Sequence, residues 1–236
     1  MRCLLTNDDG IDAPGLAELH RVASQWSDVL VVAPKRPWSG CGHQICTDRE
    51  IEVVEVRPGW WSVDAFPADC VRIGTTCVTD EVDWVISGIN DGGNLGADVF
   101  VSGTVAAARE ASLLGYSAIA ISQYRGPGPK RPWSHTGDMA DVALKNALTR
   151  PLERDRFWNI NLPDPQPHES ISVEAIRQLD CPVDINPLPA QYEKHLTRQM
   201  VVYSGRYQDR QCEPGSDVHA CFSGAISMSQ IAIRSE

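Results

Sequence analysis

The amino-acid sequence predicts an α/β fold, a Rossmann-like sandwich built around a parallel sheet. Two observations support this prediction. Short apolar runs of strand length recur along the chain, and apolar residues at 3- and 4-residue steps separate the first two runs. The first strand, the helix and the second strand together take up about 30 residues, which is the length of a βαβ unit with two parallel strands.

The predicted elements follow one another closely. Residues 3–5 are apolar and begin a buried strand, and Pro14 suits the first turn of the helix that follows. Residues 29–33 form a continuous apolar run, which predicts a strand buried on both faces. We also expect an extended pair at 45–56 and 60–66, strands at 82–87, 117–122 and 157–162, a short helix from 67, and helices at 105–114 and 138–148.

We expect an α/β catalytic domain at residues 1–163 and a C-terminal arm or hairpin at residues 164–236. Residues 164–167 (Asp-Pro-Gln-Pro) have the composition of a linker. From residue 171 onward the hydrophobic pattern weakens into short extended pieces with proline-rich joints, which is typical of an arm rather than of a second domain.

The composition argues against several classes of protein. A formal net charge of −10 leaves no basic surplus for neutralising the phosphates of a nucleic-acid polymer, so we expect no such partner. No run approaches the ~18 apolar residues of a membrane span, and the first residues are too poor in apolar side chains for a signal peptide. We therefore expect the cytoplasm as the compartment and no membrane partner. Eight cysteines form no CxxC pair, which disfavours a zinc site or a secreted disulfide framework.

Two adjacent carboxylates, Asp8 and Asp9, follow the first predicted strand. Open α/β sheets bind their ligands at the carboxyl ends of strands. Neighbouring carboxylates repel each other, and their hard oxygens suit Mg²⁺ or Mn²⁺, so the pair predicts a divalent-cation site. The alternative interpretation is an exposed Asx-turn that leads into a helix N-cap.

A second constellation follows the strand predicted at 82–87. Residues 88–98 are rich in Gly and Asn and form a loop whose backbone can approach a ligand closely. Ser102, Gly103 and Thr104 then precede an Ala-rich helix, whose free amides and positive dipole end favour a phosphate. The segment is not a Walker loop, because no Gly-Lys-Ser/Thr is present, and no GxGxxG follows the first strand.

Together these pieces resemble the SurE family, the survival-protein nucleotidases. The resemblance rests on Thr-Asn-Asp-Asp-Gly at 6–10, Pro-Gly at 14–15, Ala-Pro at 33–34, Ser-Gly at 39–40, Pro-Ala-Asp-Cys-Val at 67–71 and Ser-Gly-Ile-Asn at 87–90. It continues through Gly92, Asn94, Gly96 and Asp98-Val99 to Ser-Gly-Thr-Val-Ala-Ala at 102–107. It is good up to about residue 162 and weaker in the last third of the chain.

The resemblance implies metal-dependent hydrolysis of nucleoside monophosphates at the 5′ or 3′ phosphate. The family's Mg²⁺ or Mn²⁺ ligands map onto Asp8, Asp9, Ser39 and Asn90, one ion per subunit. Its phosphate-binding residues map onto Asn94, Ser102, Gly103 and Thr104. In relatives a C-terminal hairpin exchanges between subunits, which implies a homodimer or a homotetramer. This chain departs from the family's usual residues at Val101 (usually Tyr) and at Ala65-Phe66 (usually Gly-Thr), which bears on the shape of the substrate pocket.

The expected mechanism has Asp8 or Asp9 orienting or deprotonating a water, while Asn94 and the amides near Gly103 and Thr104 hold the charge on the phosphoryl oxygens. A covalent aspartyl-phosphate on Asp8 is the alternative mechanism. Two other functions stay open: a broad-specificity or exopolyphosphate-type phosphatase that uses the same site, and a non-catalytic nucleotide-binding regulator.

Several polar residues have ordinary structural interpretations that we prefer. We expect Asp98 to be a hydrogen-bond acceptor in a loop, Asp69 to cap or support a turn, and Trp38 to pack rather than stack on a base. His43 could donate a proton to the leaving group, but a lone loop histidine is more often exposed to solvent. We expect the basic loop 125–133 to be a solvated connection.

Overall fold

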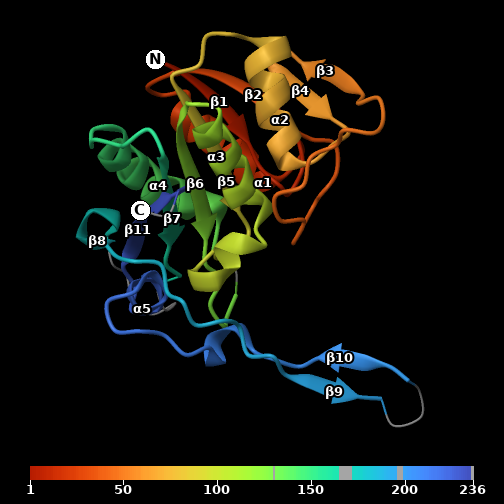
Figure 1. Cartoon of the computed structure of the whole chain (residues 1–236). Coiled ribbons are helices and arrows are strands. Elements are labelled where there is room, and N and C mark those ends of the chain that lie inside the picture. Colours follow the sequence, from red (N-terminus) through yellow and green to blue (C-terminus); the bar gives the residue numbers. More distant parts are fainter. Residues whose placement is uncertain (130, 165–171, 196–198, 235–236) are drawn as a thin grey trace.

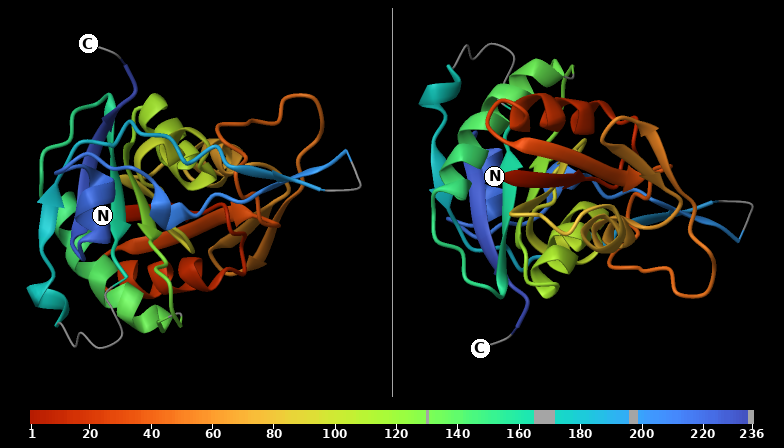
Figure 2. Two further views of the ribbon diagram at one scale, coloured as in Figure 1. Left: turned by 90° about the horizontal axis from the view of Figure 1, so that it is seen from below. Right: turned by 90° about the horizontal axis from the view of Figure 1, so that it is seen from above.

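The computed structural model describes residues 1–129, 131–164, 172–195 and 199–234. They form three layers, in which a mostly parallel sheet lies between helices on both faces (Figures 1 and 2). This arrangement confirms the predicted α/β class. It follows from the strands themselves, because continuous apolar strands must be covered on both faces.

Most elements of the first part of the chain lie close to the predicted ranges, but the segment expected to be extended at 45–56 is a strand only at 53–57, and the helix expected at 138–148 begins at 133. The strands are β1 (Arg2–Thr6), β2 (Asp28–Pro34), β3 (Val53–Arg57), β4 (Trp60–Val63), β5 (Trp84–Asn90), β6 (Ser117–Gln123), β7 (Arg156–Leu162), β8 (Gln178–Asp180), β9 (Tyr192–Lys194), β10 (Val201–Tyr203) and β11 (Ile226–Ala232). The helices are α1 (Pro14–Ala23), α2 (Pro67–Ile73), α3 (Gly103–Leu113), α4 (Trp133–Leu148) and α5 (Asp217–Phe222). Shorter helical segments are η1 (Gly74–Val78), η2 (Gly96–Phe100), η3 (Val173–Ala175) and η4 (Tyr207–Asp209).

Within the described residues the main sheet has nine strands in the order β3-β4-β2-β1-β5-β6-β7-β11-β8. The strands β4, β2, β1, β5, β6 and β7 run parallel. The chain leaves β1 toward β2 on one side and later returns to β5 on the other side of β1. The strand order therefore reverses between β1 and β5, and such a switch point opens a crevice at the carboxyl ends of the strands.

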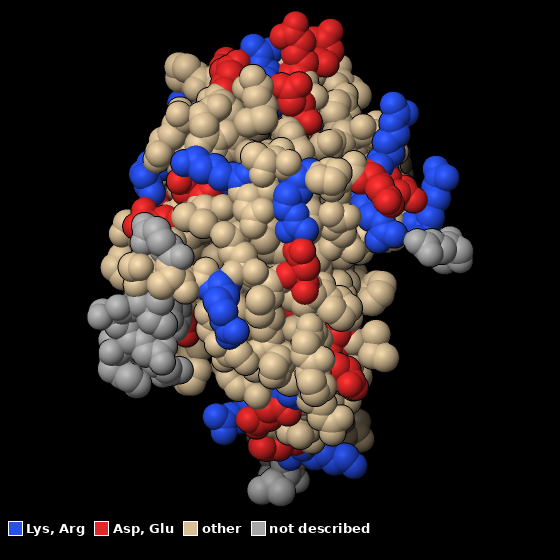
Figure 3. All heavy atoms as spheres, turned by 90° about the vertical axis from the view of Figure 1, so that its left-hand side faces the viewer, with Lys and Arg blue, Asp and Glu red and all other residues tan. Residues whose placement is uncertain are grey.

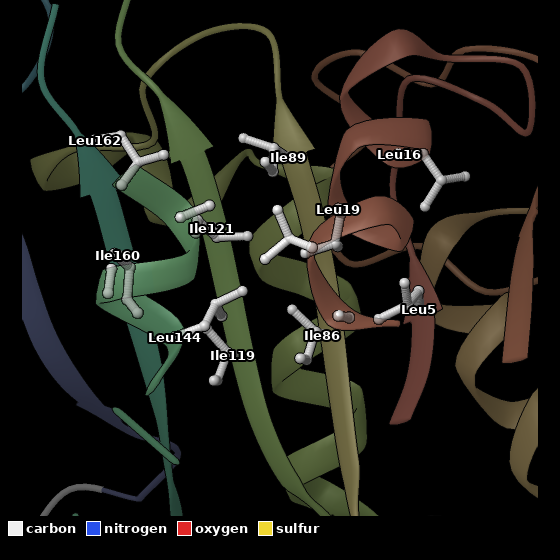
Figure 4. Packing of buried hydrophobic residues seen from close by; sticks show 14 of the residues in the cluster. Leu5, Leu16, Leu19, Ile86, Ile89, Ile119, Ile121, Leu144, Ile160 and Leu162 are labelled. Atoms are coloured by element: carbon white, nitrogen blue, oxygen red, sulfur yellow. The ribbon is translucent and has the colours of Figure 1, made fainter. Parts of the chain in front are cut away.

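Alternating residues of the central strands supply the two halves of the core. Leu5, Ile86 and Ile119 face α1 and α4, where Leu19 and Leu144 pack against them (Figure 4). The alternate positions, among them Leu4, Val85 and Ala118, face α2 and α3. Each of these side chains is fully buried. Small alanines on α3 (Ala107, Ala108 and Ala111) lie in that second cluster.

The C-terminal part of the chain contributes strands to the main sheet and also forms a separate hairpin. The strands β8 and β11 extend the main sheet, with β11 antiparallel to β7. The strands β9 and β10 form a separate hairpin that projects from the body (Figure 1). The expectation of only short extended pieces after residue 171 was wrong for α5, a helix that Ser216 caps by accepting a hydrogen bond from the amide of His219. Residues beyond 163 thus complete the sheet, while the domain division at residue 163 stays a prediction; its linker residues 165–167 lie outside the described residues.

Charged side chains of both signs are interspersed over the face shown in Figure 3, without a continuous basic stripe there. Among the helices of the described residues, none combines the length and apolar character needed to cross a membrane.

Candidate active site

The turn after β1 places the two carboxylates at the switch point. Asn7, rather than either aspartate, closes this turn: its Nδ2 donates to the carbonyl of Gly10 at 2.9 Å, and its Oδ1 accepts from the Gly10 amide. Gly10 has φ +98°, a conformation that favours glycine. Ala13 occupies the N-cap of α1 without a side-chain hydrogen bond. The alternative of Asp8 or Asp9 as a helix N-cap is therefore wrong.

Asp8 lies against the start of α3. Its side chain is only 6% exposed, and Thr104 Oγ1 donates to its Oδ1 at 2.5 Å. A Cβ on Gly103 would lie 2.8 Å from Asp8 Cβ and 2.9 Å from both Asp8 Oδ2 and Cys41 Sγ. Only glycine allows the helix to approach the carboxylate this closely.

The electrostatics of Asp8 favour a positive charge beside it. Burial raises the pKa of Asp8 from its ordinary value of 3.8 to about 6; hydrogen bonds from Thr104 oppose this rise, and the charge of Asp9 adds to it. An ionised Asp8 is thus under-stabilised by the protein alone, and a bound cation would supply the missing stabilisation.

Asp9 and Asn90 meet at the same end of the sheet. Asp9 Oδ2 accepts a hydrogen bond from the backbone amide of Asp91 at 3.1 Å. Asn90, the last residue of β5, donates its Nδ2 to the carbonyl of Gly92 at 2.8 Å. The amide nitrogen of Asn90 is engaged in this way, so the side-chain oxygen is the group left to act as a ligand.

Ser39 is brought to this region by the loop after β2. The amide of Trp38 donates to the backbone carbonyl of Asp8 at 2.7 Å, which fixes the residue just before Ser39 beside the backbone of Asp8. Ser39 itself is exposed. Its place near Asp8 was expected from the adjacency of β1 and β2, and this adjacency is confirmed.

These residues fit a hard divalent cation. Within the described residues no three His, Cys, Asp or Glu side chains are grouped so that they could hold a metal ion. A site here would consist of two carboxylates plus neutral hydroxyl and amide oxygens. That donor set suits Mg²⁺ or Mn²⁺, which keep several positions for water and phosphate.

Asn94 is fixed by a buried polar network. Its backbone amide donates to Asn161 Oδ1 at 2.8 Å, and its carbonyl accepts from the side chains of Asn159 and Asn161. Its Nδ2 donates to Ser122 Oγ at 2.7 Å. An amide nitrogen carries two protons, so one N–H of Asn94 remains for a ligand.

Ser102 begins α3 as its N-cap. Its hydroxyl accepts a hydrogen bond from the amide of Val105 at 3.1 Å, which satisfies one of the unpaired donors of the first turn. The side chain of Ser102 is therefore engaged in the helix, whereas Gly103 and both the hydroxyl and the backbone of Thr104 lie at the Asp8 carboxylate. The roles of Asn94, Ser102, Gly103 and Thr104 in phosphate binding stay predictions.

The comparison with known proteins decides the family. The model of the family described as survival protein SurE matches residues 3–182, most of the chain. The chain belongs to the SurE family.

Relatives span its whole length. A putative 5′-nucleotidase from Nostoc sp. is 42% identical, covering 99% of this chain and all of the relative, and a 5′-nucleotidase SurE from Paramagnetospirillum magneticum is 38% identical, covering 98% and 89%. The SurE protein of Aquifex aeolicus has a crystal structure similar to this one, with a TM-score of 0.86 at 27% identity and coverage of 100% of this chain and 95% of that chain.

Of the departures from the usual SurE residues, Phe66 and Val101 lie near this site, whereas Ala65 is fully buried in the core cluster beneath α2 and α3. Phe66 is half-buried, and its ring centroid lies 4.5 Å from that of Trp38. The guanidinium of Arg36 lies 4.6 Å from the Trp38 ring. Trp38 thus packs between neighbours, as expected. Val101 is exposed, and its carbonyl accepts from the Gly42 amide at 2.9 Å.

The structural interpretations of two aspartates are confirmed. Asp98 accepts hydrogen bonds from the Tyr207 hydroxyl at 2.8 Å and from Arg210 Nη1 at 2.7 Å. Asp69 accepts from the amides of Cys46 and Phe66 and so supports the start of α2. His43 is less exposed than expected, because its Nε2 lies 2.8 Å from Oε2 of Glu110, a buried residue of α3.

Sequence reasoning missed the residues that support the site. Asn159 and Asn161 alternate with apolar residues in a strand that is otherwise buried, and this pattern at a carboxyl end could have indicated a polar network. The expectation of a solvated loop at 125–133 was wrong for Arg125, whose side chain is 13% exposed and pairs with Asp91. Nothing in the local sequence of Arg125 signals this contact, because it depends on β5 and β6 being neighbours.

Proposed function

We propose that this protein is a metal-dependent phosphomonoesterase that hydrolyses nucleoside 5′-monophosphates, and also 3′-monophosphates, to nucleoside and phosphate. The observation that carries the proposal is the close approach of Asp8 to the N-terminus of α3 beside Asp9. A carboxylate pair suits a cation and a helix N-terminus suits a phosphate, so the two together suit a metal–phosphate pair. The relatives named 5′-nucleotidase SurE support a nucleotide as the substrate.

We assign the binding of one Mg²⁺ or Mn²⁺ per subunit to Asp8, Asp9, Ser39 and Asn90. When bound, the ion neutralises charge on the phosphoryl group and lowers the pKa of a water molecule. The protein itself holds both carboxylates in place near the N-terminus of α3. Thr104 Oγ1 donates a hydrogen bond to Asp8, and the backbone amide of Asp91 donates one to Asp9.

In the proposed reaction Asp8 or Asp9 orients the attacking water and accepts its proton as the water oxygen attacks phosphorus. The bond between phosphorus and the ester oxygen breaks, and that oxygen takes a proton from solvent water to become the hydroxyl of the nucleoside, while the aspartate later returns its proton to solvent. The free N–H of Asn94 and the amides of Gly103 and Thr104 hold the charge that develops on the other phosphoryl oxygens.

We also propose that the protein is a homo-oligomer in the cytoplasm, assembled through the β9–β10 hairpin. Tyr192, Val201, Val202 and Tyr203 of this hairpin are between 45% and 64% exposed. An isolated two-stranded hairpin is marginally stable in water, so a second chain that covers these side chains would stabilise it.

The test is phosphate release from a panel of substrates by the full chain with Mg²⁺, with Mn²⁺ and with EDTA. The panel contains 5′- and 3′-monophosphates of several bases, an aryl phosphate and a short polyphosphate. Release that needs the metal and favours nucleotides supports the proposal. Equal rates with the aryl phosphate or polyphosphate would favour the broad phosphatase. Nucleotide binding without release by folded protein would favour the non-catalytic regulator.

A further inference from the structure

Arg125 connects the end of β6 to the loop that directly follows Asn90, one of the candidate metal ligands. It lies two residues after the end of β6, and its Nε donates to Asp91 Oδ1 at 2.6 Å. The Arg125 side chain is only 13% exposed and that of Asp91 is 32% exposed. The arginine is largely covered while the aspartate reaches solvent, and the bond is a short charge-assisted one.

The residue that Arg125 holds is itself in contact with the site. The backbone amide of Asp91 donates to Asp9 Oδ2, and Asp91 directly follows Asn90. The Asn90 side chain in turn bonds the carbonyl of Gly92. A shift of Asp91 would therefore move both the hydrogen bond that orients Asp9 and the backbone that carries Asn90.

The far side of the guanidinium is fixed as well. The Cζ of Arg125 lies 4.7 Å from the centre of the Trp133 ring, at the start of α4. Its Nη1 is buried and has no hydrogen-bond partner among the described residues. A cation over an aromatic face is stabilised electrostatically, which compensates in part for the missing partner. The Trp133 ring packs against Gly15 of α1. The ring below the Arg125 guanidinium is therefore held between α1 and α4.

We propose that Arg125 is a positioning residue for the divalent-cation site, acting through Asp91 on Asp9 and Asn90. This inference rests on the proposed metal-dependent function. Arg125 does not touch the ion or the substrate; it holds Asp91, which directly follows the proposed ligand Asn90 and donates its amide to the proposed ligand Asp9. Lysine cannot replace it fully, because an ammonium lacks the planar fork that bonds Asp91 and stacks on Trp133 at the same time.

The test is a titration of the full chain with Mn²⁺ alone, in which electron paramagnetic resonance reports free Mn²⁺. We compare the wild type with Arg125→Gln and Arg125→Lys. The matched control is Arg150→Gln, because Arg150 also bonds an aspartate, Asp180, at 2.7 Å and also lies over a tryptophan ring, that of Trp158, at 4.6 Å.

Partners that orient metal ligands are worth about 10–100-fold in metal affinity. We therefore expect Arg125→Gln to raise the dissociation constant for Mn²⁺ about tenfold or more, and Arg125→Lys to raise it less. Arg150→Gln should leave the constant unchanged, although both glutamine variants lower the unfolding temperature of the metal-free chain. Excess Mn²⁺ should restore phosphate release to Arg125→Gln. If Arg125→Gln does not fold, Asp91→Ala removes the acceptor of the same hydrogen bond and should give the same loss.

The outcomes separate this inference from the proposed function. Wild type that binds Mn²⁺ and releases phosphate, with equal Mn²⁺ affinity in Arg125→Gln, would overturn the positioning role alone. An equal loss of affinity in Arg150→Gln would also overturn it, because the effect would then be one of general stability. Wild type that binds no Mn²⁺ would overturn the proposed metal site and the positioning role together.

Discussion

At the scale of single residues, Asp8 combines burial, a like charge beside it and a helix N-terminus. Burial and Asp9 disfavour its ionised form, whereas the hydrogen bonds from Thr104 favour it, and burial dominates. A site of this kind is costly for the metal-free protein and becomes favourable when a cation binds. Under the proposed function, Asp8 is thus a ligand whose position costs the metal-free protein stability.

This balance predicts how stability depends on pH. The folded chain holds the proton of Asp8 with a pKa of about 6, against 3.8 when unfolded. The charged form is therefore unfavourable in the folded state, and stability is lost as the pH rises from about 4 through 6, by roughly 3 kcal/mol in all. Asparagine does not ionise, so Asp8→Asn should not lose stability in this way as the pH rises.

We expect Asp8→Asn in EDTA to unfold at a higher urea concentration than the wild type at pH 8, and the difference to shrink by about half at pH 5. Asp12→Asn is the control, because Asp12 is an exposed carboxylate of the same region. A wild type more stable than Asp8→Asn at pH 8, or a difference independent of pH, would contradict this account of Asp8.

At the scale of elements, the segment that precedes α3 is tied to the C-terminal part of the chain. Asp98 in η2 pairs with Arg210, whose side chain is fully buried, and Gly96 donates its amide to Asp217 Oδ2 at 2.8 Å. The strands and helices of the first two thirds could be predicted from apolar spacing. The contacts of Gly96 and Asp98 with the C-terminal part could not be predicted in this way, because they join residues more than 100 positions apart and leave no local pattern in the sequence.

The β9–β10 hairpin yields a prediction at the same scale. Val202 is 64% exposed in the single chain, so Val202→Lys should leave the stability of the subunit nearly unchanged. In an oligomer joined through the hairpin, the same change would bury a charge at the interface and disfavour assembly. We expect light scattering to show a smaller mass for Val202→Lys than for the wild type.

The control is Leu113→Lys, which introduces the same charge at an exposed leucine, 56% accessible, at the end of α3. A monomeric wild type, or an unchanged mass for Val202→Lys, would contradict assembly through the hairpin.

At the scale of the whole molecule, the topology brings the candidate site together. Asp8 and Asp9 follow β1, Asn90 ends β5, and Asn94 lies in the loop before η2, so the reversal of strand order between β1 and β5 collects residues that are some 80 positions apart. Polar residues directly after apolar strands mark a carboxyl edge, so the sequence was enough to predict that these residues lie at one edge of the sheet, while their roles as ligands stay predictions. The residues that hold them in place, among them Asn161 and Arg125, lie in or just after strands farther along the sheet. Their contacts could be recognised only once the order of the strands was known.

The most direct test of the account is phosphate release from a nucleoside 5′-monophosphate by the wild type and by Asp8→Asn, each with Mn²⁺ and with EDTA. The account predicts release by the wild type only with Mn²⁺, and a rate at least about 10²-fold lower for Asp8→Asn. The urea transition of Asp8→Asn described above serves as the control for folding. Substantial release by folded Asp8→Asn, or undiminished release by the wild type in EDTA, would contradict a metal-dependent site built on Asp8.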